Sequence, residues 1–154
     1  MKIIDKLTDD DKIRISFEVF PPKTDAGLEK VMEATELISK LEPSYISVTY
    51  GAGGGTSKNT ARIANHIKTE LGVESLAHLT CASSTKDEVR RVIDDLKVLG
   101  IENILALRGD IPQGMEFPTS NRFRYAYELV EEIRKSGDFC IGAACYPEGH
   151  VENE

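Results

Sequence analysis

Short apolar segments typical of strands alternate with longer segments of helical periodicity along the chain. The predicted strands cover residues 14–20, 45–51, 75–81, 103–110 and 139–147. Between them, apolar residues recur at the spacing of amphipathic helices, across 28–38, 63–71, 89–96 and 126–133. Strands and helices that alternate at a step of about thirty residues form βαβ units and a parallel sheet. The sequence therefore predicts an α/β fold with five strands.

Residues typical of helix ends agree with this alternation. Thr85 and Glu88 have the spacing of a capping box at a helix start, and Gly100 and Gly137 follow two predicted helices where C-caps belong. No linker or low-complexity segment interrupts the series. We therefore expect a single domain over residues 1–154.

Two architectures fit the alternation, an open doubly wound sheet and a (β/α)8 TIM barrel. The central strands of a doubly wound sheet are apolar on both faces. In the first strand, however, Phe17 and Val19 share one face while Ser16 and Glu18 share the other. We expect the later strands to divide in the same way, with an apolar face made by Ile46, Val48, Leu79, Cys81, Leu105, Leu107, Ile141 and Ala143. A barrel whose mouth is a functional site explains this pattern better.

The length of the chain bears on the same choice. A barrel of about 250 residues uses roughly 31 residues for each unit. The 154 residues of the chain would supply about the first five of the eight units. We therefore expect the N-terminal portion of a barrel, with a complete five-stranded open sheet as the alternative.

Composition excludes several classes of function. The chain has a net charge of −7, which argues against binding to nucleic acid or to an anionic membrane, because both require a basic face. It has no apolar run of about 20 residues that would span a bilayer. Three cysteines without paired spacing favour a reduced cytoplasmic protein and give no support for a metal site.

Glu18 is the most informative single residue, because it is a carboxylate in an otherwise apolar strand. A desolvated carboxylate is costly unless it is paired or protonated. One interpretation is a solvated or ion-paired glutamate at the end of a strand. The other is a general acid among Phe17, Val19 and Phe20.

Other candidate residues fall at the predicted C-terminal ends of successive strands, where barrel active sites lie. Arg108, Gly109 and Asp110 form either a pair within a loop or a ligand-binding turn. His78 and Tyr146 are as compatible with packing as with binding, and His150 carries little information alone. Their shared location favours a site.

The glycine-rich segment TYGAGGGTSKNT, residues 49–60, resembles a phosphate-binding loop but fails both common patterns. Two residues, Thr56 and Ser57, separate the last glycine from Lys58, and Thr56 stands where a dinucleotide fingerprint requires its third glycine. A loop that ends in a helix cap at Thr56 or Ser57 is the better interpretation.

Five segments together carry a family resemblance. They are FEVFPPK (17–23), SVTYGAGGGT (47–56), HLTC (78–81), LALRGD (105–110) and AACYPEGH (143–150). With them, residues 14–150 resemble the N-terminal part of bacterial methylenetetrahydrofolate reductases. The resemblance implies a (β/α)8 barrel that binds FAD. It also implies reduction of 5,10-methylenetetrahydrofolate to 5-methyltetrahydrofolate by NAD(P)H, in a ping-pong cycle that feeds methionine biosynthesis.

The resemblance also implies residue roles. Glu18 would be the general acid, and Asp110 would lie between flavin and folate, bind the pterin and modulate the flavin potential. Glu18, Asp110 and Thr49 would contact the folate substrate. The residues implied at the FAD site are Thr49, Tyr50, His78, Arg108, Gly109, Asp110, Ala126, Tyr146 and His150, although the long loop at 113–122 weakens the match at Ala126.

The family pattern continues beyond this sequence, because its last three strands have no counterpart here. We therefore expect the isolated chain to have little or no activity. Whether the full-length enzyme forms a homo-oligomer stays open, as does the choice between NADH and NADPH. Two alternatives are a non-catalytic, doubly wound binding or regulatory module and an inactive relative that retains only the flavin site.

Overall fold

Ten helices and strands make up the part of the chain that the structure describes. A computed structural model describes residues 1–8, 13–50, 57–111, 113–114, 116–117 and 119–149. In chain order the elements are α1 (Ile3–Leu7), β1 (Ser16–Val19), α2 (Asp25–Ser39), β2 (Tyr45–Val48), α3 (Ser57–Thr69), β3 (Ser75–Thr80), α4 (Lys86–Val98), β4 (Asn103–Leu107), α5 (Ala126–Ser136) and β5 (Cys140–Ala143). All five predicted strands and all four predicted helices are therefore confirmed, while α1 was not predicted.

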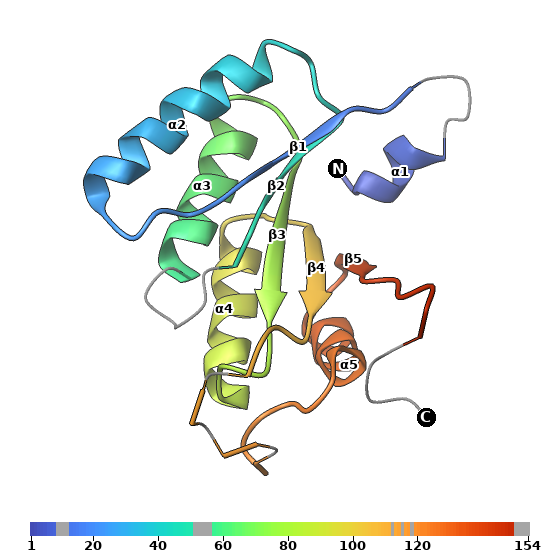
Figure 1. Cartoon of the computed structure of the whole chain (residues 1–154). Coiled ribbons are helices and arrows are strands. Elements are labelled where there is room, and N and C mark those ends of the chain that lie inside the picture. The colour runs from blue at the N-terminus through green and yellow to red at the C-terminus, as the bar shows by residue number, and fades with distance from the viewer. Residues whose placement is uncertain (9–12, 51–56, 112, 115, 118, 150–154) are drawn as a thin grey trace.

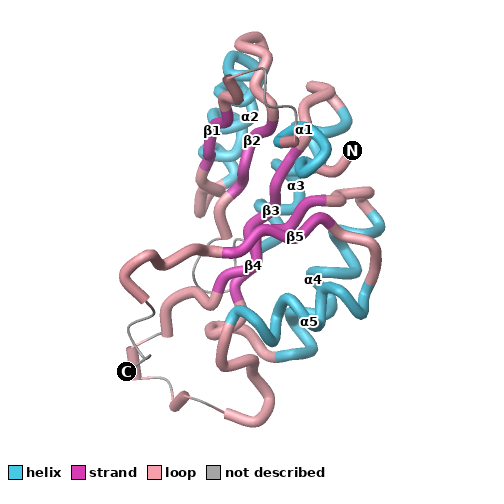
Figure 2. Tube along the Cα trace, turned by 90° about the vertical axis from the view of Figure 1, so that its right-hand side faces the viewer, coloured by secondary structure: helices cyan, strands magenta, loops and turns pink. Residues whose placement is uncertain are grey.

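The five strands form one parallel sheet in the order β1-β2-β3-β4-β5 (Figure 2). Every pair of neighbouring strands is parallel. A doubly wound sheet reverses its strand order at a switch point, and this sheet does not. The doubly wound alternative is therefore wrong. The sheet is instead the arrangement of consecutive βα units in a (β/α)8 barrel, which confirms the predicted fold class over five units.

One face of the sheet packs against the helices, and we call it the helix face. Its strand residues are fully buried, as Ile46, Val48, Leu79 and Ile104 show. They join buried helix residues in a single core: Ile63, Ile67, Val89, Ile93, Leu96, Leu129 and Ile133. We call the opposite face, which carries Glu18, the site face. The strand alternation therefore separates a core from a face that is available for function.

The fourth strand corrects the predicted division of faces. Leu105 was expected on the apolar face, but it pairs in register with His78 and so lies on the site face. Ile104 and Ala106, which are buried, occupy the helix face in its place. The strand has apolar side chains on both faces, so its alternation alone could not show which face packs against helices. The consequence is that Leu105 and Leu107 give the site face an apolar part.

The predicted helix ends are confirmed where the structure describes them. The Thr85 hydroxyl accepts a hydrogen bond from the Glu88 amide, and the Glu88 carboxylate accepts one from the Thr85 amide, which completes the capping box. Gly100 adopts a φ of 68° just after α4, a conformation that glycine tolerates best. Gly137 caps α5. Of the two caps expected for α3, Ser57 is instead the first residue of the helix, and Thr56 lies outside the described residues.

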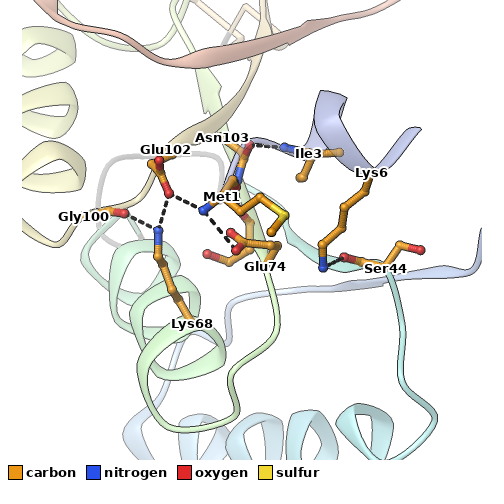
Figure 3. A network of polar contacts seen from close by, with 10 residues as sticks. Met1, Ile3, Lys6, Ser44, Lys68, Glu74, Gly100, Glu102 and Asn103 are labelled. Carbon is orange, nitrogen blue, oxygen red and sulfur yellow. Dashed lines mark hydrogen bonds and ion pairs between the residues drawn. The ribbon is translucent and has the colours of Figure 1, made fainter. Parts of the chain in front are cut away.

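Helix α1 lies where β3 and β4 begin, opposite the end at which the candidate residues gather (Figure 1). Its Ile3 amide donates to Asn103 Oδ1 at 2.8 Å. The N-terminal ammonium of Met1 contacts Glu74 and Glu102, and Lys68 Nζ donates to Glu102 Oε2 at 2.8 Å (Figure 3). These contacts fix a five-residue helix that is too short to be stable alone.

Long apolar helices do not occur in the described part of the chain. Among those residues, no helix is both long and apolar enough to cross a membrane.

Candidate functional site

The candidate residues gather at one edge of the sheet because its strands are parallel. Thr49 and Tyr50 follow β2, Arg108 to Asp110 follow β4, and Tyr146 lies beyond β5. Arrowheads in Figure 1 show that β3 and β4 run toward the same edge. The carboxyl ends of parallel strands are the usual location of ligand sites in α/β folds. The structure therefore places Thr49, Tyr50 and residues 108–110 directly after the carboxyl ends of their strands.

Glu18, Ser47 and His78 meet on the site face of three neighbouring strands. Glu18 pairs in register with Ser47, and the Ser47 hydroxyl donates a hydrogen bond to Glu18 Oε2 at 3.2 Å. His78 Nε2 lies 3.4 Å from the same carboxylate oxygen. The structure thus joins the carboxylate to the histidine, and it adds a serine that the candidate set did not include.

The surroundings of Glu18 differ from the apolar enclosure that was one of the two interpretations. The Glu18 side chain is 47% exposed, and Phe20 is 68% exposed. Val19 is buried on the helix face, because successive strand residues point to opposite faces. Glu18 is therefore a partly solvated carboxylate paired with polar groups, as the other interpretation held, although it remains open to a ligand.

His78 is the buried member of this group, with a residue exposure of only 7%. Burial lowers the pKa of His78 because it desolvates the imidazolium, and the nearby negative charge of Glu18 acts in the opposite direction. The imidazole is accordingly biased toward its neutral form, in which one ring nitrogen donates a hydrogen bond and the other accepts one. Such a group can hold a carboxylate by a hydrogen bond or, when protonated, by an ion pair.

The backbone around Thr49 is fixed by hydrogen bonds to the end of β1 and to α3. The Thr49 amide donates to the Val19 carbonyl at 3.0 Å. The Thr60 hydroxyl, in α3, donates to the Thr49 carbonyl at 2.9 Å. Tyr50 follows and packs against the core. Thr49 therefore lies against the end of β1, one residue beyond Glu18.

The turn after β4 is bound tightly to the end of β3. Arg108 O accepts hydrogen bonds from the amides of Cys81 and Ala82, at 3.2 and 2.9 Å. Gly109 has a φ of 75°, and a Cβ atom at this position would lie only 2.8 Å from Thr80 Cβ. Only glycine fits both conditions without strain. The turn therefore holds Asp110, which is exposed, at a defined place on the edge.

Cys81 ends the segment HLTC (78–81), which is one of the five that carry the family resemblance, but it is unsuited to nucleophilic chemistry. It is fully buried, and burial raises the pKa of its thiol to about 11, because the thiolate would be desolvated. The residue therefore contributes to the core.

The remaining candidates have less defined surroundings. Ala126 is the first residue of α5, and its helix start is held by Glu128, whose carboxylate accepts from the amides of Arg124 and Tyr125. Tyr146 is 57% exposed. His150 and the glycines at 51 and 53–55 lie outside the described residues. Within those residues, no three His, Cys, Asp or Glu side chains come close enough to hold a metal ion.

Ser47 is the site residue that sequence reasoning missed. Period-two alternation does place it on the same face as Glu18, but it does not give the register between the two strands. The register brings together residues 29 positions apart.

Comparison with known proteins identifies relatives over the whole site. The family model described as "Methylenetetrahydrofolate reductase" matches residues 3–154. A protein of Escherichia coli (strain K12) named "5,10-methylenetetrahydrofolate reductase" is 40% identical over 141 residues. "Methylenetetrahydrofolate reductase (NADH) 1" of Zea mays is 40% identical over 159 residues.

The relatives are longer than the chain. The matched region covers 92% of this chain but only 46% of the Escherichia coli protein. For the Zea mays protein the corresponding shares are 99% and 27%. The chain therefore spans less than half the length of these two relatives.

Proposed function

The chain belongs to the methylenetetrahydrofolate reductase family, and from this premise we propose that it forms the part of such a reductase that carries the general acid. The proposed reaction reduces 5,10-methylenetetrahydrofolate to 5-methyltetrahydrofolate with NAD(P)H, in one-carbon metabolism and methionine biosynthesis. The proposed location is the cytoplasm. Because the chain spans only part of its relatives, this activity is proposed for a protein that contains the chain.

The placement of Glu18 is the observation that carries the proposal. The carboxylate lies on the site face and is partly exposed. Its Oε2 atom is within 3.2 Å of Ser47 Oγ and 3.4 Å of His78 Nε2. A general acid must be accessible to substrate and held within hydrogen-bond reach of the atom that it protonates. In the proposed reaction Glu18 donates a proton that helps to open the methylene bridge of the folate.

Asp110 and Thr49 complete the proposed contacts to the folate. Asp110 is exposed after the tightly held turn at Gly109, where its carboxylate can accept hydrogen bonds from pterin N–H groups. Thr49 follows β2 and has its backbone fixed by Val19 and Thr60. Both side chains lie at the edge that carries Glu18.

The site face also fits a flat aromatic cofactor such as the FAD isoalloxazine. Leu105 and Leu107 are half-buried there. Gly142 is the register partner of Leu105, and the Leu105 side chain lies against it, because a Cβ atom on Gly142 would lie only 3.0 Å from Leu105 Cδ1. An apolar surface bordered by polar strand ends suits a ring with a polar rim.

Several residues of the chain would hold FAD, and FAD would supply the hydride transfer. Thr49, Tyr50, His78, Arg108, Gly109, Ala126 and Tyr146 are proposed to contact FAD. When bound, FAD would carry hydride between the nicotinamide nucleotide and the folate in two separate half-reactions. The chain's own task is then to bind both substrates, orient them and supply the proton from Glu18.

A chimaera provides the test of this function. In it, the chain replaces the matching segment of the Escherichia coli relative, so that the missing length is supplied. We expect a yellow protein that contains FAD and performs both half-reactions. We expect the isolated 154-residue chain to show no methyltetrahydrofolate turnover with a dye acceptor.

Substitution of the proposed acid makes the test specific. Glu18→Gln in the chimaera should abolish folate reduction and spare oxidation of the nicotinamide donor. Glu33→Gln, at an exposed carboxylate of α2, is the matched control and should change neither. Equal loss of both half-reactions in Glu18→Gln would remove Glu18 from the acid role.

A further inference from the structure

Three polar side chains from three successive strands share one contact point on the site face. Glu18 comes from β1, Ser47 from β2 and His78 from β3. The two outer residues are not on neighbouring strands. Strands in a sheet lie about 4.8 Å apart, so β1 and β3 are separated by roughly 10 Å. A contact between Glu18 and His78 must therefore pass over β2.

The small size of Ser47 allows this contact. Ser47 is the register partner of Glu18, and its own partner on β3 is Leu76, two residues before His78, so the carboxylate reaches diagonally past Ser47. His78 Nε2 nevertheless lies 3.4 Å from Glu18 Oε2. A branched or longer side chain at residue 47 would fill the space that the carboxylate crosses. The contact therefore depends on a small residue in the middle strand.

Ser47 also takes part in the contact through its hydroxyl. Its Oγ atom lies 3.2 Å from Glu18 Oε2 and 3.4 Å from the Phe17 carbonyl oxygen. A charged carboxylate is the stronger acceptor of the two and is also the nearer one. Both Ser47 and His78 thus act on Oε2, and among the described residues no hydrogen bond or ion pair falls on Oε1. One oxygen is held, and the other is available to a ligand.

The three residues differ in how firmly the protein holds them. Ser47 is 6% exposed and His78 is 7% exposed, so neighbouring atoms fix both side chains. The Glu18 side chain is 47% exposed, and a solvated glutamate at a strand end samples several rotamers. The buried pair therefore supplies the orientation that the exposed carboxylate lacks.

We propose that Ser47 and His78 are positioning residues for Glu18, which hold Oε2 across β2 so that Oε1 faces the substrate. This assigns His78 a role toward the acid instead of, or in addition to, a contact with FAD. The proposal deepens the function proposed above and rests on it for its catalytic meaning. The contact itself can be tested without any cofactor or substrate.

The first experiment measures the pKa of His78 by NMR titration in the 154-residue chain. The negative charge of Glu18 raises the pKa of His78, and Leu105, the register partner of His78 on β4, carries no charge. Glu18→Gln should therefore lower this pKa, whereas the control Glu33→Gln should leave it unchanged. An unchanged His78 pKa in Glu18→Gln would overturn the proposed contact.

Substitutions at residue 47 separate the effects of size and hydroxyl. Ser47→Val should lower the pKa of His78 in the same direction as Glu18→Gln, because the branched side chain keeps the carboxylate away. Ser47→Ala should leave the carboxylate near His78, so that the pKa stays closer to the original value. The proposal is wrong if the pKa of His78 in Ser47→Val equals that in the unchanged chain. Because Glu18 is exposed, Glu18→Gln keeps the test valid even if a Ser47 variant fails to fold.

The catalytic consequence is measured in the chimaera. Loss of one hydrogen bond to a charged group should reduce kcat of the folate half-reaction about tenfold in Ser47→Ala. The nicotinamide half-reaction and the folate KM should stay nearly constant. Ser47→Thr, which retains the hydroxyl, should recover more of kcat than Ser47→Val, which has nearly the same shape. Equal kcat for Thr and Val would overturn the hydroxyl's role.

The two experiments distinguish failure of the contact from failure of the function. If His78 responds to Glu18→Gln but the chimaera does not reduce folate, the contact stands and the proposed function is wrong. If the chimaera is active but His78 does not respond, the function stands and the positioning role is wrong.

Discussion

Gly109 offers a quantitative test of how the turn at the site edge is built. The residue lies between Arg108 and Asp110, has a φ of 75°, and approaches the end of β3. Gly109→Ala introduces two separate costs. The left-handed backbone conformation disfavours any L-residue with a Cβ atom, by about 1–2 kcal/mol. The new Cβ atom would also lie 2.8 Å from Thr80 Cβ, which is a steric clash.

The size of the steric cost follows from which atom is met. Thr80 Cβ is attached directly to the backbone of β3, so rotation of the threonine side chain does not relieve the contact. Overpacking of this kind costs about 1–3 kcal/mol. The two costs together predict a loss of about 2–5 kcal/mol in the free energy of unfolding. That is a large part of the roughly 5–15 kcal/mol that stabilises a typical domain.

Gly100→Ala is the matched control for the backbone cost alone. Gly100 has a φ of 68°, and a Cβ atom there meets nothing within 4 Å. Its substitution should therefore cost about 1–2 kcal/mol. Urea denaturation followed by far-UV circular dichroism measures both variants, provided that the m-value stays constant. The reasoning is refuted if Gly109→Ala is no less stable than Gly100→Ala.

Three further predictions concern regions away from the site. Lys68 and the N-terminal ammonium lower the pKa of Glu102 to about 2, so its stabilising contribution should be complete above its ordinary pKa of 4.5 and disappear as the pH falls toward 2. Because Glu102 is 40% exposed, Glu102→Gln should lower the free energy of unfolding by only about 0.5–1 kcal/mol at pH 7. In acid-denaturation curves, the stability difference between this variant and the unchanged chain should vanish near pH 2. A stability difference that does not change with pH would contradict the ion pairs. Asn103 is 1% exposed and forms hydrogen bonds with Ile3 N, Met1 O and Ser75 O. Asn103→Ala would leave these groups unpaired, so urea unfolding should show a loss of about 2–4 kcal/mol in the free energy of unfolding. A loss below 1 kcal/mol would show that Asn103 does not hold α1. Thr85→Ala should lower the free energy of unfolding by about 1 kcal/mol, because it removes the N-cap of α4. Thr85→Ser keeps a hydroxyl and should retain most of this stability. Equal stability of the Ala and Ser variants would contradict the capping role.

Local patterns in the sequence were sufficient for the five strands and for helices α2 to α5. Helical spacing and capping residues such as Thr85 depend on neighbours within a few positions, and these predictions are confirmed. The same holds for the first three strands, where alternation between apolar and polar residues defines two faces. The prediction failed in β4, where Leu105 and Ile104 are both apolar. Alternation carries no information when both faces are apolar.

The candidate site was predictable in location and only partly in composition. Parallel βα units place the ends of all strands at one edge, so Thr49, Arg108 and Asp110 could be assigned to that edge from sequence. The exposure of Glu18 and Phe20 could not, because solvent access depends on which elements cover a strand end.

The sequence by itself determined the order and type of the five strands and of helices α2 to α5, because strand alternation and helix periodicity are properties of adjacent residues. The tertiary structure alone decided the contacts between strands. Glu18 meets Ser47 and His78 only in the register that this sheet adopts. Helix α1, five residues long, is held by Asn103, which is 100 positions from Ile3. Contacts of this kind depend on how distant segments pack, and no local pattern encodes that packing.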